Sequence, residues 1–139
     1  MKRHLNIAFA YAIAAMVGGV FYREFTKWNG FTGVTALGKV HVHLFLLGMM
    51  VFLLVALFAD RFDLSGSRSF SIFMRVYNLG VPLTACMLVI RGITQVLGTP
   101  LASGADMAIS GISGIGHILV GIGLVALLLS LRRAAAREA

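Results

Sequence analysis

The sequence predicts an all-α integral membrane protein, a four-helix bundle with up-down-up-down topology. Of its 139 residues, 59% are hydrophobic and 12% are charged, and the mean hydropathy is +0.92. A soluble domain of this length cannot bury that much apolar surface. The apolar residues also gather in four runs, each close to the ~20 residues that a helix needs to cross a bilayer. Because backbone polar groups in lipid must be paired, helices are the expected form of each run.

The four predicted helices form a single domain, residues 1–139, and lie at about 5–22, 40–59, 72–97 and 108–131. The first follows the letters MKRH, like a signal peptide, but no small-residue cleavage site comes after it, so we expect a retained helix. The third contains Cys86, the only cysteine. A single cysteine excludes an intramolecular disulfide, and we expect Cys86 to be a small buried core residue.

The basic residues predict the orientation of the helices rather than a nucleic-acid partner. The net charge is +7, but the cations are scattered around predicted helix ends, as expected next to lipid. Four spans put both termini on one side. That side carries Lys2, Arg3, Arg61, Arg68, Arg75, Arg132, Arg133 and Arg137, and the other carries Arg23, Lys27, Lys39 and Arg91. The excess predicts that both termini are cytoplasmic.

Three histidines lie inside apolar runs, where ionisable side chains usually mark function. His41 and His43 open the second helix and His117 lies in the fourth. We expect the first two about one turn below the outer surface and His117 deeper, at ~15 Å. Residues i and i+2 of a helix point about 200° apart, so His41 and His43 cannot ligate one haem from the same face. Either they serve two sites, or one is a ligand and the other has a polar partner.

His117 lies in a stripe of small residues. Ser110, Ser113, Gly114 and Gly121 fall on its side of the helix, which would let a flat macrocycle lie against the backbone. Close helix–helix packing is the alternative explanation of such a stripe. On the second helix, Gly48 continues the face of His41, and we expect Gly48, Gly114 and Gly121 to be cofactor-binding residues.

Neutral imidazole is a common metal and haem ligand, and the chain contains little else for chemistry. The acidic residues fall in predicted loops or the tail, which disfavours zinc, paired membrane acids and a proton-coupled transporter. Copper on the imidazoles is possible but has less support than haem. We expect His41, His43 and His117 to be the candidate metal ligands.

Two cations on the outer side could hold the carboxylates of a haem. Arg91 is too deep for a simple interface anchor, and Arg23 ends the first predicted helix. The planar guanidinium fork pairs with carboxylates bidentately. The alternative for Arg23 and Lys27 is that they extend to lipid head groups.

Several motifs carry a resemblance to known proteins. The stretches FYREFTKWNGFTG at 21–33, GKVHVHLFLLGMM at 38–50, RGITQVLGT at 91–99 and SGISGIGHILVGIGL at 110–124 resemble a family of small bacterial four-helix membrane proteins of unknown function. This resemblance implies the fold and a location in a bacterial inner (cytoplasmic) membrane. The His-x-His of the second helix is also similar to the catalytic subunit of haem–copper oxidases and nitric oxide reductases, in which two such histidines reach different haems. The chain lacks the further histidines that would hold copper, so oxygen reduction is not implied.

These observations predict a membrane-embedded b-type haem protein for electron transfer or for binding O2 or NO. Without a Cys-x-x-Cys-His motif, the haem b would be held by ligation and packing alone. The alternative is a haem-free small transporter or assembly factor whose histidines are structural. Since His41 and His43 face opposite ways, we expect a closed homo-oligomer in the lipid, with a trimer favoured and a dimer second.

Overall fold

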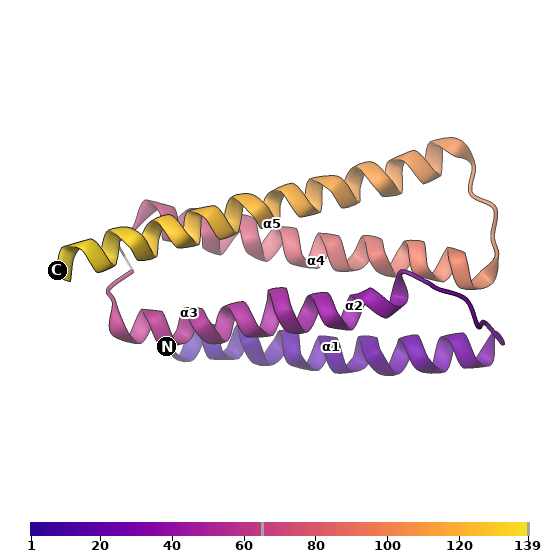
Figure 1. The fold of residues 1–139 in the computed structure, drawn as a ribbon, viewed down its shortest axis with the longest axis horizontal. Helices are drawn as coiled ribbons and strands as arrows, with labels where there is room; N and C mark the ends of the chain where they lie inside the picture. The colour runs from indigo at the N-terminus through magenta and orange to yellow at the C-terminus, as the bar shows by residue number, and fades with distance from the viewer. Residues whose placement is uncertain (65, 139) are drawn as a thin grey trace.

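The computed structural model describes residues 1–64 and 66–138, and it confirms the all-α prediction (Figure 1). Its helices are α1 (Lys2–Trp28), α2 (Leu37–His43), the π-helix η1 (Leu44–Met50), α3 (Val51–Arg61), α4 (Arg68–Leu97) and α5 (Ser103–Glu138). Since α2, η1 and α3 follow one another without a break, the described residues form four long helices. These run up and down in turn, and both termini lie at the same end (Figure 1).

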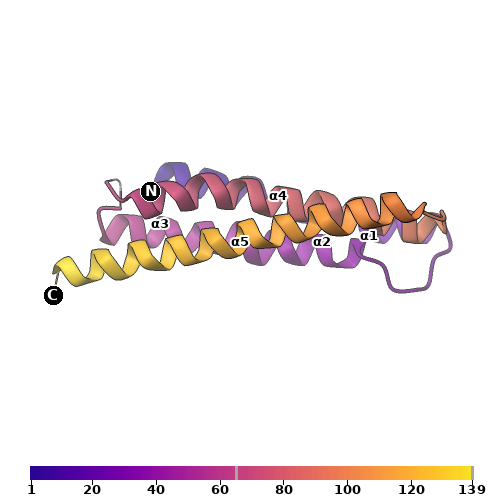
Figure 2. The same ribbon diagram turned by 90° about the horizontal axis from the view of Figure 1, so that it is seen from above.

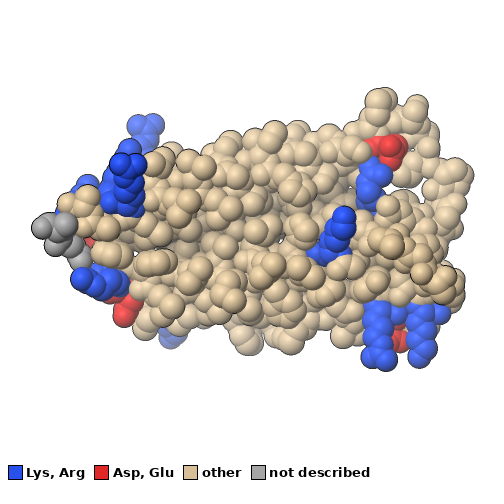
Figure 3. All heavy atoms as spheres, in the orientation of Figure 1, with Lys and Arg blue, Asp and Glu red and all other residues tan. Residues whose placement is uncertain are grey.

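The four long helices identify a multi-pass membrane protein. Each is long and apolar enough to cross a bilayer. Figure 3 shows Lys, Arg, Asp and Glu gathered toward the two ends of the molecule, with a broad belt of uncharged side chains between them. A belt of this kind suits the hydrocarbon region, and the charged bands suit the two head-group regions.

Most helices extend beyond the predicted apolar runs. Hydropathy marks the part of a helix that lies in hydrocarbon, whereas helical hydrogen bonding continues into the polar ends. For this reason Glu24, Asp60 and Asp106 lie in helices, not in loops as predicted. Helix α4 begins where the Ser67 hydroxyl accepts a hydrogen bond from the Phe70 N–H at 3.3 Å. It ends at Gly98, whose φ of 62° favours glycine.

The predicted helix over 40–59 is confirmed as part of one span, Leu37–Arg61, and the middle of this span is the π-helix η1. Two contacts account for the widened turns. The Tyr77 hydroxyl donates a hydrogen bond to the Leu47 carbonyl at 2.8 Å. At Gly48 the backbone presses against the ring of Tyr11, which leaves no room for a Cβ. π-helical turns inside α-helices are rare and occur frequently at functional sites.

Helices that are neighbours in the sequence pack against each other in space. Figures 1 and 2 together show α1 and α4 on one face of the molecule, and the second long helix with α5 on the other. An aromatic core closes the half that carries the termini. There Phe52 contacts the rings of Tyr11, Phe73 and Tyr77, with centroids 5.8, 5.7 and 6.1 Å away.

An apolar groove of about 1360 Å³ separates α1 and α4, and its lining on α1 extends from Lys2 to Phe21. Cys86 lines this groove and is exposed. The prediction that Cys86 is a buried core residue was therefore wrong, because its side chain faces the open groove between α1 and α4.

The second long helix begins against α4 and well short of the ends of α1 and α4 (Figure 1). The Thr35 hydroxyl donates to the Gly92 carbonyl at 3.0 Å, and the Ala36 N–H donates to Gln95 Oε1 at 2.8 Å. Gly92 has no space for a Cβ because Leu37 lies against it. These contacts fix the start of α2 and the depth of the histidines that follow.

Candidate haem-binding site

The structure brings His43 and His117 together from α2 and α5. Their ring centroids are 6.3 Å apart and their ring planes are nearly perpendicular, at 87°. The predicted difference in depth was wrong, because the second long helix begins well short of the ends of α1 and α4 and so places His43 deeper than expected (Figure 1). The two imidazoles consequently lie at one level.

Both imidazoles are held by their own helices in the same tautomer. His43 Nδ1 lies 2.8 Å from the Lys39 carbonyl, and His117 Nδ1 lies 2.8 Å from the Ser113 carbonyl. A carbonyl oxygen can only accept, so each Nδ1 carries the proton. Each Nε2 then keeps its lone pair for a metal, in the arrangement that orients many metal-binding histidines.

His41 lies on the opposite side of its helix, as the helical geometry predicted. It packs against α1, with its Cβ 3.7 Å from a Cβ built on Gly19. Its ring stacks on Tyr22 at a centroid distance of 6.4 Å. Within the described part of the chain, His41 Nδ1 is buried without a hydrogen-bond partner. His41 therefore belongs to the α1–α2 contact and is separate from the His43–His117 pair.

Gly114 and Gly121 lie on either side of His117 on α5, three residues before it and four after it. Both are exposed, and a Cβ on either would meet nothing within 4 Å. The contact between α4 and α5 uses other glycines instead. Gly116 lies against Thr84 and Gly123 against Tyr77. Helix packing within this chain therefore does not explain the small residues beside His117, and they leave room for a flat group.

Gly48 has a different role from the one predicted for a cofactor-binding residue. It is buried, and a Cβ there would collide with the Tyr11 ring. The small residue is needed for the contact between η1 and α1.

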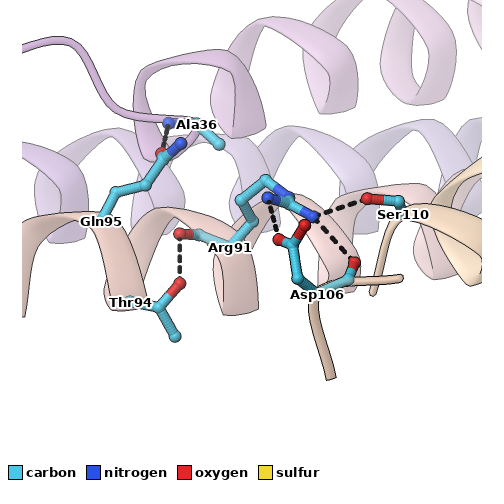
Figure 4. A network of polar contacts seen from close by, with 6 residues as sticks. All are labelled: Ala36, Arg91, Thr94, Gln95, Asp106 and Ser110. Atoms are coloured by element: carbon cyan, nitrogen blue, oxygen red, sulfur yellow. Dashed lines mark hydrogen bonds and ion pairs between the residues drawn. The ribbon is translucent and has the colours of Figure 1, made fainter. Parts of the chain in front are cut away.

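Arg91 is engaged by the protein itself (Figure 4). Its Nη1 lies 2.9 Å from Asp106 Oδ1, and its Nη2 donates to the Ser110 hydroxyl at 2.7 Å and to the Asp106 carbonyl at 3.3 Å. The fork thus joins α4 to the first turns of α5. Sequence reasoning missed this partner because it began the fourth helix at 108, although the depth of Arg91 was a signal that it needed an acid nearby.

Arg23 remains a surface residue. Its side chain is 81% exposed, and Nε lies 3.9 Å from Glu24 Oε1, at the limit of an ion pair. An exposed pair at this separation holds a side chain only weakly. This placement suits contact with lipid head groups.

His43 and His117 supply two nitrogen ligands, which suits a metal whose other ligands come from a macrocycle. Among residues 1–64 and 66–138, no group of three or more His, Cys, Asp or Glu could hold a metal ion, so a tetrahedral zinc site has no support. Two imidazoles on neighbouring helices are a set that a haem iron can take in addition to its four ring nitrogens.

The fold and this site define a small integral membrane protein with a pair of imidazoles between two of its four helices. The chain belongs to the family described as protein of unknown function (DUF2871), whose model matches residues 1–134. No curated protein and no solved structure matches it. The likeness of its His-x-His helix to haem–copper oxidases stays a prediction.

Proposed function

We propose that this protein binds one b-type haem between α2 and α5, with His43 and His117 as axial ligands. The observation that carries the proposal is the separation of 6.3 Å between the two ring centroids. A metal about 2 Å from one nitrogen of each ring would place the centroids about 6 Å apart. The hydrogen bonds of both Nδ1 atoms support the same ligation, since in the neutral imidazole they leave the lone pair on Nε2.

Two axial histidines support electron transfer as the function. A six-coordinate iron has no open position for O2 or NO, whereas loss of one histidine would create one. Gly114 and Gly121 would allow the macrocycle to approach α5 closely. Gas binding is therefore the second function at the same site.

The haem-free alternative, a transporter or assembly factor with structural histidines, has less support. That interpretation expects imidazoles to join helices by hydrogen bonds. The Nδ1 bonds of His43 and His117 stay within their own helices, and His41 Nδ1 has no partner among the described residues. Copper on two imidazoles has less support than haem, because it would lack further protein ligands.

The proposed setting is a bacterial inner membrane with both termini in the cytoplasm, supported by the excess of cations on the terminal side. The proposed assembly is a closed homo-oligomer, with a trimer favoured. His117 is exposed on α5, so one edge of a haem beside it would face lipid unless a second copy covered it. The opposite faces of His41 and His43 do not themselves support the oligomer, because α1 covers His41 within one chain.

The test is the visible spectrum of the full chain purified from haem-replete cells. We expect a b-type spectrum in the reduced form and about one haem per chain, extractable by acid acetone because nothing attaches it covalently. A protein that is colourless as purified and stays colourless after haem addition would overturn the proposal.

A further inference from the structure

A groove of about 1360 Å³ lies between α1 and α4, and neither His43 nor His117 lines it. The second long helix forms its floor through Val40 and Leu44. The two walls meet where the rings of His4 and Phe70 lie 5.7 Å apart. Beyond this contact, small and apolar side chains line the groove, among them Ala10, Ala14, Pro82, Cys86 and Val89.

The charge of the groove is confined to one end. Lys2 and Arg3 line it there, followed by the amide of Asn6, and its lining includes no acidic residue. Neither cation forms an ion pair with any residue in 1–64 or 66–138. A site with two free cations at its mouth and hydrocarbon along its length suits an anionic amphiphile.

The length of the groove agrees with a lipid of the leaflet next to Lys2. Its lining on α1 extends from Lys2 to Phe21, which is about 28 Å at 1.5 Å per residue. One acyl chain covers about half of a hydrocarbon core of about 30 Å. A chain whose phosphate lies at Lys2 and Arg3 therefore ends near Ala14, where the groove is still open.

We infer that the groove is a binding site for one anionic phospholipid per chain. Lys2 and Arg3 bind the phosphate, and one acyl chain lies between α1 and α4 over Val40 and Leu44. The site is independent of the proposed haem, because none of the residues that line it is a histidine.

Native mass spectrometry of the full chain, titrated with phosphatidylglycerol or phosphatidylcholine of identical acyl chains, tests this inference. We expect one tight phosphatidylglycerol per chain, bound about 30-fold more tightly than phosphatidylcholine, which is the factor that two cations supply next to an anionic lipid. The double variant Lys2→Gln/Arg3→Gln should lose this preference. The matched control Arg132→Gln/Arg133→Gln removes two cations from the same end of the molecule, outside the groove, and should keep it.

A second variant tests the apolar part of the site. Ala14→Phe should fill the groove and weaken both lipids about tenfold or more, whereas Ala108→Phe, on the exposed surface of α5, should not. Equal affinity of the unmodified protein for the two lipids would overturn the inference. So would an equal loss of the phosphatidylglycerol preference in Lys2→Gln/Arg3→Gln and in Arg132→Gln/Arg133→Gln. So would lipid release on self-association, since that would show a second copy in the groove.

Discussion

At the scale of single residues, the open space around His117 depends on two neighbouring glycines that have no side chain. Gly114 and Gly121 have open space where a Cβ would be, and the Nδ1 bond to Ser113 fixes the ring. The surface of α5 beside the His117 imidazole therefore carries no side chains at Gly114 and Gly121, and the His43 ring lies next to it.

A larger side chain at Gly114 or Gly121 should displace the haem without unfolding the protein. We expect Gly114→Leu or Gly121→Leu to lower the haem content several-fold, because the new side chain occupies the space beside His117. Helical content and melting temperature of the purified protein should change little, since neither glycine packs against the chain. Full haem occupancy in both variants would contradict the proposed place of the macrocycle.

In contrast to Gly114 and Gly121, Gly48 should matter for the stability of the protein. We expect Gly48→Ala to destabilise the protein by about 1–3 kcal/mol, since its Cβ would overpack the Tyr11 ring. Unfolding of the full chain by a denaturing detergent measures the effect. Gly114→Ala is the matched control and should be neutral or slightly stabilising. An unchanged stability of Gly48→Ala would show that η1 and α1 can move apart freely.

Sequence alone predicted part of this site. The opposite faces of His41 and His43 follow from 100° per residue in any helix. The choice of partner does not, because it depends on where α2 begins. That start is set by Ala36 N–H on Gln95 and by Leu37 on Gly92, contacts between residues more than fifty positions apart.

At the scale of helices, polar contacts hold α4 to its neighbours, and two of them lie at sites that hydrophobicity does not mark. Tyr77 bonds the Leu47 carbonyl within the π-helix, and Arg91 bonds Asp106 and Ser110 at the start of α5. Sequence predicted the four spans because hydrophobicity identifies hydrocarbon-crossing helices. It predicted neither connection, since a π-helix has no sequence signature of its own and Asp106 fell outside the predicted helix.

Breaking the Arg91–Asp106 connection should loosen the first turns of α5. We expect faster backbone amide exchange over 106–112 in Arg91→Gln and in Asp106→Asn, with little further effect in the double variant. The coupling energy should be about 0.2–1 kcal/mol, because both side chains are partly exposed. Arg23→Gln is the control, since its contact is long and exposed. Additive effects of the two substitutions would contradict a direct pair.

At the scale of the whole molecule, the two faces have different surroundings. One face carries the apolar groove, and the other carries the exposed His117 with the open glycines beside it. Closing the second face against another copy would shield a haem edge from lipid through a repeated heterologous contact.

Native mass spectrometry in mild detergent should therefore find a haem-loaded trimer, with a dimer as the second possibility. Gly114→Leu should reduce the oligomer together with the haem, whereas Ala108→Phe should leave both intact. A stable monomer with full haem occupancy would contradict the closed assembly and leave the ligation unaffected.

The most direct test of the central proposal is the low-spin haem spectrum of three matched variants, His41→Ala, His43→Ala and His117→Ala. The proposal predicts that His43→Ala and His117→Ala each lose the six-coordinate signal, by haem loss or by conversion to a five-coordinate form. His41→Ala should keep the signal, because that ring packs against Gly19 and Tyr22. An unchanged spectrum in His43→Ala and His117→Ala, or its loss only in His41→Ala, would contradict the assignment.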